Sequence, residues 1–136
     1  MCFAASIRNK GHIATTDIRV EKVFLKKSDE NFYRSPFYND FKWWIGIEEQ
    51  SILKKLKNTY FKEILIENGL HSAKHIDKSS TQYWVTYSTK GYAITRMRPE
   101  EPSVICECII PKGAEYYCNK DGEYVSNRLI LVKPIE

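Results

Sequence analysis

The chain has 136 residues, a length that suits a single domain over residues 1–136 with one hydrophobic core. Its net charge of +4 favours an anionic partner but is too small to predict nonspecific or specific DNA binding. No apolar run approaches the roughly 20 residues that a membrane-spanning helix needs, and the first residues do not resemble a signal peptide. We therefore expect a cytoplasmic protein with no membrane partner and with free thiols.

The first third of the sequence predicts strands separated by a loop. Residues 17–25 (DIRVEKVFL) are typical of a strand, and their apolar phase changes between Val20 and Val23, which predicts a bulge or burial on both faces. Residues 31–40 (NFYRSPFYND) contain Ser-Pro and Asn-Asp and predict a loop with aromatic anchors. Residues 41–46 (FKWWIG) are short, aromatic and strand-like.

Residues 47–58 predict the main helix of the protein. Ile52, Leu53 and Leu56, followed by Tyr60, form an apolar stripe at helical spacing. Glutamates occupy the first turn and lysines the last turns, as the helix dipole favours. We interpret these lysines as a solvated helix face rather than as a phosphate-binding patch.

Strand patterns return after this segment. Residues 61–69, 81–87 and 92–98 are rich in strand-forming side chains, and the last two are joined by a loop that contains Gly91. A helix over residues 80–88 is the alternative interpretation, but the density of Thr, Tyr, Val and Trp there favours a strand.

The C-terminal part completes the predicted sheet. Residues 104–110 (VICECII) predict a buried strand, AEYYCNKDGEYVSN predicts a hairpin tightened by Asp121 and Gly122, and residues 128–133 predict a core strand. The whole pattern predicts an α+β domain: a mostly antiparallel sheet of about six to eight short strands with one main helix near 47–58.

Cysteine and histidine positions favour neither a metal nor a cofactor. Cys106 and Cys108 alternate with Glu107 on a strand, which predicts two core thiols that face the same side. His71 and His75 lie four residues apart, a metal-ligand spacing on a helix, but the zinc-protease pattern requires a glutamate between them. Because a third ligand would have to come from elsewhere in the chain, a metal site is the less favoured alternative.

Two loop segments predict a site for a nucleotide-type ligand. Such a ligand needs aromatic rings that stack on a base, together with cations and backbone NH groups that bind phosphate. Residues 33–36 (YRSP) and 110–117 (IPKGAEYY) combine these groups. The predicted ligand-binding residues are Tyr33, Arg34, Ser35, His71, Lys112, Gly113, Tyr116 and Tyr117.

His71 belongs to this set because of its place in the predicted sheet. If residues 61–70 form one extended segment with Leu70 buried, the period of two places His71 on the opposite face, where a ligand could approach. Its side chain can donate to a phosphate or carbonyl oxygen. His75 lies in a strongly polar run and is expected to face solvent.

Several short segments together carry a family resemblance. The segments RSPF, WWIG, Gly-Leu-His-Ser, CIIPKGAEYY and EYVSNRLIL span most of residues 18–131. Their combination resembles small uncharacterised proteins encoded by phages and gut-type bacteria, which implies a phage or prophage origin and no particular chemistry. Near the C-terminal end, one predicted strand is followed by Pro-Lys-Gly and a second strand. This arrangement is also similar to the last strands of ADP-ribosyltransferase-like folds. The Arg, Ser-x-Ser and Glu-x-Glu set of the arginine-specific enzymes is not matched.

These observations favour binding over catalysis. The sequence contains no glycine-rich phosphate loop, Ser-His-Asp set or paired-carboxylate signature. We expect a protein that binds a small anionic, nucleotide-like ligand, and by analogy with small phage proteins one that sequesters a nucleotide immune signal. One alternative is an enzyme acting on nucleotides or ADP-ribosyl groups, with His71 as acid–base group and Glu107, Glu115 or Glu123 as its partner. Another is an inhibitor whose aromatic surface docks on a host defence protein; a second copy of the chain is a further candidate partner.

Overall fold

The computed structural model describes residues 3–6, 11–35, 41–58, 63–67, 69–76, 103–119 and 122–135. These residues form thirteen β-strands and contain no helix. The described part of the protein is therefore all-β, and the predicted α+β class is wrong.

The strands form two antiparallel sheets. The larger sheet has ten strands, which are β2 (His12–Ile13), β3 (Ile18–Leu25), β4 (Tyr33–Arg34), β5 (Lys42–Trp43), β6 (Glu48–Gln50), β9 (Leu70–Ala73), β10 (Ser103–Ile110), β11 (Glu115–Cys118), β12 (Glu123–Ser126) and β13 (Arg128–Pro134). Their order is β2-β11-β12-β9-β3-β10-β13-β6, with β4 paired to β3 and β5 paired to β4. The smaller sheet has the order β1-β8-β7, formed by β1 (Phe3–Ser6), β8 (Glu63–Glu67) and β7 (Lys54–Asn58).

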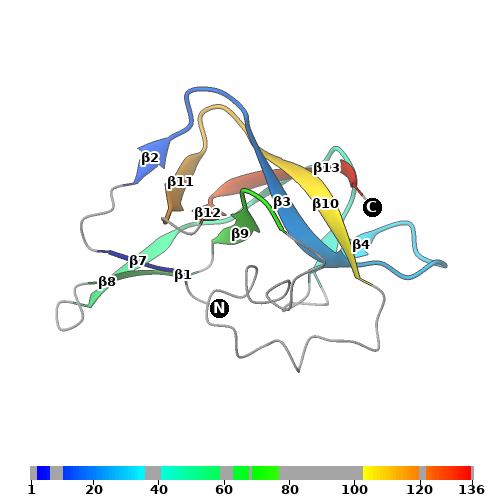
Figure 1. Ribbon diagram of the computed structural model, residues 1–136, viewed down its shortest axis with the longest axis horizontal. Coiled ribbons are helices and arrows are strands. Elements are labelled where there is room, and N and C mark those ends of the chain that lie inside the picture. The colour runs from blue at the N-terminus through cyan, green and yellow to red at the C-terminus, as the bar shows by residue number, and fades with distance from the viewer. Residues whose placement is uncertain are drawn as a thin grey trace.

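The two longest strands, β3 and β10, lie side by side at the centre of the larger sheet (Figure 1). Their pairing is continuous from Ile18, opposite Ile110, to Leu25, opposite Ser103. Every side chain from Val20 to Leu25 is buried, which confirms the predicted burial on both faces of this strand. The strands predicted over residues 17–25, 104–110 and 128–133 are thus present as β3, β10 and β13.

The larger sheet curls around on itself. β12 pairs with β9, β9 with β3, β3 with β10, and β10 with β13. This series of paired strands starts at β12 and ends at β13. Only Asn127 separates these two strands in the sequence, so the series ends next to the strand at which it started. The inner face of the curl holds the main hydrophobic core, whose buried members are Ala14, Val20, Phe24, Tyr33, Trp43, Cys106, Cys108, Ile110, Ala114, Leu129 and Leu131.

The helix predicted over residues 47–58 is replaced by strands of two different sheets. β6 pairs with β13 in the larger sheet, whereas β7 pairs with β8 in the smaller one. Ile52, a member of the predicted apolar stripe, is 84% exposed. The stripe therefore buries no single helical face, and pairing with neighbouring strands overrides the helical preference of the segment.

The extended segment predicted over residues 61–70 is also divided. β8 ends at Glu67 in the smaller sheet, and β9 begins at Leu70 in the larger one. The predicted hairpin that contains Gly122 is confirmed, because β11 pairs with β12 and Gly122 has a positive φ of 80°. The strands predicted over 81–87 and 92–98, with Gly91 between them, lie outside the described residues.

The smaller sheet contacts the outer face of the larger one. Ile66 of β8 packs with Tyr117 of β11 and Val125 of β12, and Leu53 packs against this second cluster. Tyr117 and Val125 lie opposite each other in the β11–β12 pairing and share this face. The strands β11 and β12 are therefore packed on both sides.

Gly69 is required where the chain enters β9. A Cβ atom at this position would lie 1.9 Å from Cγ2 of Val125 and 2.9 Å from Cδ2 of Leu53, both within the packed second cluster. We expect Gly69→Ala to lower the free energy of unfolding by about 2–3 kcal/mol, because the overpacked core must shift. Urea denaturation measures this change.

Gly46→Ala is the matched control for this substitution. Nothing lies within 4 Å of the Cβ position of Gly46, and its φ of +83° is the only obstacle. That backbone strain costs about 1 kcal/mol. A loss at Gly69 that is no larger than the loss at Gly46 would contradict the packing at the start of β9.

Candidate functional site

The most unusual side chain in the core is Lys22 of β3, which is only 3% exposed. Its Nζ donates a hydrogen bond to the carbonyl oxygen of His71 at 2.8 Å. Nζ also lies 5.8 Å from the ring centroid of Phe24 and 5.9 Å from that of Trp43. Lys22 thus points to the inner face of the curled sheet, where both of these rings are core residues.

Burial changes the protonation of this amine. Desolvation by the surrounding core lowers the pKa of Lys22 from 10.5 to about 7, although the nearby Cys108 thiol opposes the shift. Near neutral pH the site therefore holds both the ammonium ion and the free amine. An amine in this state can bind an anion when protonated and act as a nucleophile or base when neutral.

Ser72 is the inner-face neighbour of Lys22 on the adjacent strand. Glu21 lies opposite Ala73 in the antiparallel pairing of β3 with β9, so Lys22 and Ser72 are the next pair along these strands. Ser72 is 4% exposed, and its Oγ has no hydrogen-bond partner within the described part of the chain. Because a buried hydroxyl without a partner is costly, this one is poised to bind a further group.

Aromatic rings extend the same face away from Ser72. Tyr124 lies opposite Ser72 in the β9–β12 pairing, and its ring centroid is 5.9 Å from that of Tyr116 on β11. The ring of Tyr116 in turn stacks on His12 of β2 at 5.2 Å, with the two planes 26° apart. We call His12, Tyr116, Tyr124, Ser72 and Lys22 the inner row; it crosses five neighbouring strands in the order β2-β11-β12-β9-β3.

Tyr33 and Ser35 from the predicted site lie beside the Lys22 end of the inner row. Tyr33 is buried with its ring edge-on to Phe24 at 5.9 Å. Ser35 accepts a hydrogen bond of 2.7 Å from Nε1 of Trp43, the second ring near Lys22. These two residues therefore support the aromatic surroundings of the amine.

Arg34, between these two residues, is engaged in an ion pair. Its guanidinium donates to the Glu30 carboxylate at 2.5 and 3.1 Å, which holds the pKa of Glu30 below its usual value. The Arg34 guanidinium also lies 5.0 Å from the ring centroid of Phe32. An anionic ligand would have to compete with the carboxylate for this side chain.

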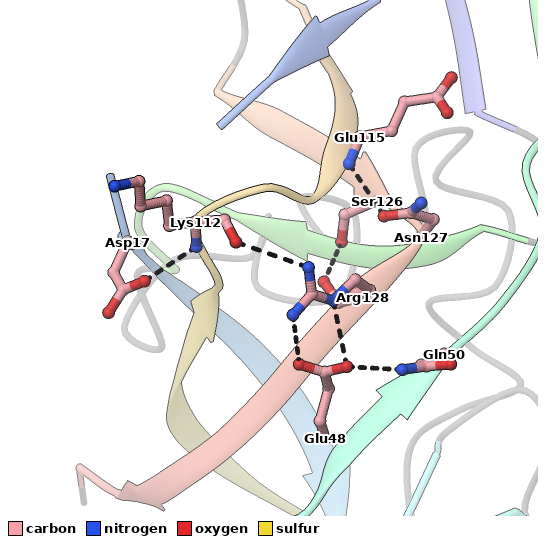
Figure 2. Close-up of polar contacts among 8 residues, drawn as sticks. All are labelled: Asp17, Glu48, Gln50, Lys112, Glu115, Ser126, Asn127 and Arg128. Atoms are coloured by element: carbon pink, nitrogen blue, oxygen red, sulfur yellow. Dashed lines mark hydrogen bonds and ion pairs between the residues drawn. The ribbon is translucent and has the colours of Figure 1, made fainter. Parts of the chain in front are cut away.

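Lys112 and Gly113 form the turn between β10 and β11, where both backbone NH groups already donate hydrogen bonds. The NH of Lys112 donates to the Asp17 carboxylate at 2.9 Å, as Figure 2 shows, and the NH of Gly113 donates to the carbonyl of Ala14 at 2.8 Å. Gly113 has a positive φ of 92°. The turn predicted from the sequence is present, but its NH groups stabilise the sheet.

Arg128, whose guanidinium donates to the Lys112 carbonyl of this turn at 3.5 Å, is paired with Glu48 (Figure 2). Two hydrogen bonds of 2.9 and 3.1 Å join the guanidinium to the carboxylate, which also accepts a bond of 2.7 Å from Gln50. These bonds hold the pKa of Glu48 below its usual value. The pair joins β6 to β13 and is structural.

The two predicted cations Arg34 and Lys112 lie at opposite ends of β3. Arg34 lies opposite Leu25 at one end, while Lys112 adjoins the other end, near Ile18. Eight strand residues separate these ends, a distance of roughly 20–25 Å. Arg34 and Lys112 therefore do not converge on one small ligand.

Tyr116 and Tyr117 lie on opposite faces of β11. Tyr116 belongs to the inner row, whereas Tyr117 is buried in the second cluster, with Nζ of Lys55 5.6 Å from its ring centroid. Only the first of these two predicted tyrosines can contact a ligand on the inner face.

The two histidines of β9 and the following residues differ in their surroundings. His71 pairs with Val125, a member of the second cluster on the outer face, so its carbonyl rather than its ring contacts Lys22. The side chain of His75 is 74% exposed, with Nδ1 at 3.4 Å from the Glu21 carboxylate. No group of three or more metal-binding side chains is found within the described ranges.

The cysteines in the described ranges are free thiols. Cys106 and Cys108 are fully buried on the inner face, as predicted, and burial raises the pKa of the Cys108 thiol above its ordinary value. Cys118 is partly buried, and its pKa is also raised by desolvation. The thiols of Cys108 and Cys118 therefore remain protonated near neutral pH and are poor nucleophiles.

Lys22 is absent from the predicted site residues, although one feature of the sequence indicates its burial. The apolar phase change in residues 17–25 predicted burial on both faces, and a lysine inside such a strand must itself be buried. Ser72 and Tyr124 carried no comparable signal, because they join Lys22 only through the strand order β12-β9-β3.

Comparisons with family models, with curated proteins and with solved structures give no match to this chain. Within the described residues, no helix is long and apolar enough to cross a membrane. What the inner row can bind therefore follows from its own geometry and charge.

Proposed function

We propose that the protein binds a small anionic ligand with an aromatic ring, of the nucleotide type, on the inner row. The observation that carries this proposal is the buried Lys22 amine at one end of a series of aromatic rings. Rings provide stacking for a base, and a buried ammonium provides a strong, specific contact for an anionic group.

The energetics of Lys22 support a role other than stability. Burying an amine in an apolar core is costly, and an apolar side chain of similar volume would stabilise the fold at least as well. Ser72 adds a buried hydroxyl that can donate to a phosphate oxygen. Both features are explained if an anionic group binds between them.

Two of the three carboxylates that an enzyme would use, those of Glu107 and Glu123, have other partners. Glu107 accepts a hydrogen bond of 2.7 Å from Arg19, and Glu123 accepts one of 2.8 Å from the side chain of Asn119. The neutral, unprotonated amine of Lys22 is a stronger candidate for a nucleophile or a base than these carboxylates. We therefore favour binding over general acid–base catalysis.

In a cellular setting, we place this binding protein in the cytoplasm. If the chain is encoded by a phage, as its resemblance suggests, its role would be to sequester a nucleotide immune signal of the host. Sequestration needs affinity and abundance and requires no turnover.

Isothermal titration calorimetry with cyclic dinucleotides and cyclic ADP-ribose isomers tests the proposal. For the ligand that binds, Lys22→Met is expected to reduce the affinity by about 10- to 150-fold, the effect of losing one charge-assisted hydrogen bond. Lys133→Ala removes an exposed lysine of β13 and should leave the affinity unchanged. His71→Ala should have a smaller effect than Lys22→Met, because the His71 ring lies on the outer face.

Two outcomes would contradict this function. One is the absence of heat and of any thermal shift across the panel at high micromolar ligand. The other is an equal loss of affinity in Lys22→Met and Lys133→Ala. A thermal melt of each variant checks that it is folded.

A second candidate function, docking on a host protein, is supported by an exposed apolar turn. Trp44, Ile45 and Ile47 are exposed, although the turn is fixed by a hydrogen bond of 2.8 Å from the NH of Gly46 to the carbonyl of Leu131. A rigid turn with exposed apolar side chains is typical of an interaction surface. Affinity capture from host lysate with the wild type and with Trp44→Ser tests this alternative.

A further inference from the structure

We infer that the apolar turn of residues 44–47 and the cations beside it form a surface that binds reversibly to anionic lipid bilayers. The contact is peripheral: a few side chains enter the headgroup region, and no membrane-spanning helix is needed. This surface is separate from the inner row, so the inference does not depend on the proposed ligand. It replaces the expectation of no membrane partner, which considered only spanning helices and signal peptides.

Two backbone hydrogen bonds fix the apolar turn. The NH of Ile47 donates to the carbonyl of Trp44 at 3.2 Å, and the NH of Gly46 donates to the carbonyl of Leu131 at 2.8 Å. Gly46, the third of the four residues, has a positive φ of 83°, which is typical of a type II turn. Trp44 is nevertheless 42% exposed, Ile45 53% and Ile47 54%. Because the backbone is already ordered, little conformational entropy is lost when a partner covers these side chains.

Cationic side chains lie directly beside these apolar groups. The ring centroid of Trp44 lies 5.9 Å from that of Phe32. Nζ of Lys42 lies 4.6 Å from the Phe32 centroid, and the guanidinium of Arg34 lies 5.0 Å from it. Lys133, on the strand β13 that holds the turn, is also exposed. In Figure 1, β4 and the C-terminal end of β13 lie at the same edge of the molecule.

The positive charge of this surface is available to a partner. Neither Lys42 nor Lys133 forms an ion pair with a carboxylate among the residues that the structure describes. Two carboxylates of the adjoining segments, Glu30 and Glu48, are each already paired with an arginine. The surface thus combines exposed apolar side chains with unpaired positive charge, which suits an anionic partner.

A bilayer fits this combination better than other partners. A stable protein interface buries about 20–30 residues on each side, far more than a turn of four residues and its neighbours provide. A second copy of the chain, docked symmetrically on the same surface, would bring Lys42 against its own counterpart. Single-stranded nucleic acids need aromatic rings for stacking, but Ile45 and Ile47 are aliphatic. A bilayer accommodates all three groups, since tryptophan lies at the headgroup level, aliphatic side chains enter the acyl boundary and lysines bind anionic headgroups.

Co-sedimentation of the full chain with lipid vesicles tests this inference. One set of vesicles contains phosphatidylcholine with roughly a third phosphatidylserine, and the other contains phosphatidylcholine alone. We expect binding to the anionic vesicles that weakens at high salt and is about 30-fold weaker without phosphatidylserine, because two lysines lose their attraction to the headgroups. Tryptophan emission should shift to shorter wavelength on binding, and Trp44→Phe should abolish that shift.

Single substitutions separate the apolar and the electrostatic contributions. Ile45→Ser is expected to reduce the vesicle affinity by about 10-fold, and Lys42→Gln by about fivefold. Ile13→Ser is the apolar control, because Ile13 is 62% exposed on β2. Lys112→Gln is the charge control, because Lys112 is exposed at the opposite end of β3 from Arg34. Both controls should bind vesicles like the wild type, and a thermal melt of each variant checks that it is folded.

Three outcomes would overturn the inference. The first is equal affinity for vesicles with and without phosphatidylserine, and the second is an equal loss of affinity in Ile45→Ser and Ile13→Ser. The third is the absence of vesicle binding while Trp44→Ser loses a host protein that the wild type captures, which would assign the turn to protein docking. None of these results bears on ligand binding at the inner row, which calorimetry tests separately.

Discussion

Lys22→Met is expected to make the protein more stable at pH 6, by roughly 1–4 kcal/mol in the free energy of unfolding. At that pH the wild type must bury an ammonium ion in a core that contains Phe24 and Trp43. Methionine has a similar length, carries no charge and fills the same space. Urea denaturation of both proteins at pH 6 measures the difference.

The advantage of Lys22→Met should shrink as the pH rises. Burial lowers the pKa of Lys22 from 10.5 in the unfolded chain to about 7 in the folded one. Below pH 7 both states carry the proton and the folded wild type bears the full cost. Between pH 7 and about 10.5 only the unfolded state holds the proton, so the wild type gains about 1.4 kcal/mol per pH unit relative to the variant.

Comparison of the two proteins at each pH removes the contributions of the other titrating groups, including the buried thiols. A difference in unfolding free energy that is constant from pH 6 to pH 9 would contradict the buried position of this amine. We expect Lys22→Met to be more stable than the wild type and to bind the ligand less well. That combination indicates that Lys22 serves binding at the expense of stability.

Trp43→Ala should destabilise the protein by about 3–5 kcal/mol, the range for removing a large aromatic side chain from a core. Trp43 is 1% exposed, contacts the ring of Phe24 edge-on at 5.3 Å and donates to Ser35. Its loss leaves a cavity in the inner face and the Ser35 hydroxyl without this donor. Urea denaturation at pH 7 measures the change.

The neighbouring Trp44 gives a control with the same chemistry one residue away. Trp44 is 42% exposed, so Trp44→Ala should change the free energy of unfolding by no more than about 0.5 kcal/mol. Trp43→Phe keeps most of the packing, so its loss of unfolding free energy should fall between the losses for Trp43→Ala and Trp44→Ala. Equal effects of the two alanine substitutions would contradict the orientation of β5.

Much of the sheet could be predicted from local patterns. Residues 17–25 and 104–110 carry strong strand signals because they are buried, and they form the central pair β3 and β10. The helix predicted over residues 47–58 is wrong because Gln50 of β6 and Lys54 and Lys55 of β7 are exposed, so no alternation of buried and exposed side chains distinguishes a strand from a helix there. The spacing of Ile52 and Leu53 with the later apolar residues matched a helix by coincidence.

The candidate site was less predictable, since it depends on strand order. The aromatic composition of residues 110–117 predicts that both tyrosines contact the ligand, yet alternation along β11 places Tyr116 in the inner row and Tyr117 on the outer face. Lys22 joins the row because β9 is inserted between β12 and β3. Only the three-dimensional pairing reveals such a neighbour.

The central pairing of β3 with β10 has a consequence for how the protein folds. Arg19 and Glu107, which bond across these strands, are 88 positions apart in the chain. During synthesis β3 leaves the ribosome long before β10. The apolar side chains of β3 therefore stay unburied until most of the chain has been made. Contacts this distant in sequence make folding slow and expose unpaired strand edges to aggregation. We expect expression at low temperature or with added chaperones to raise the yield of folded protein.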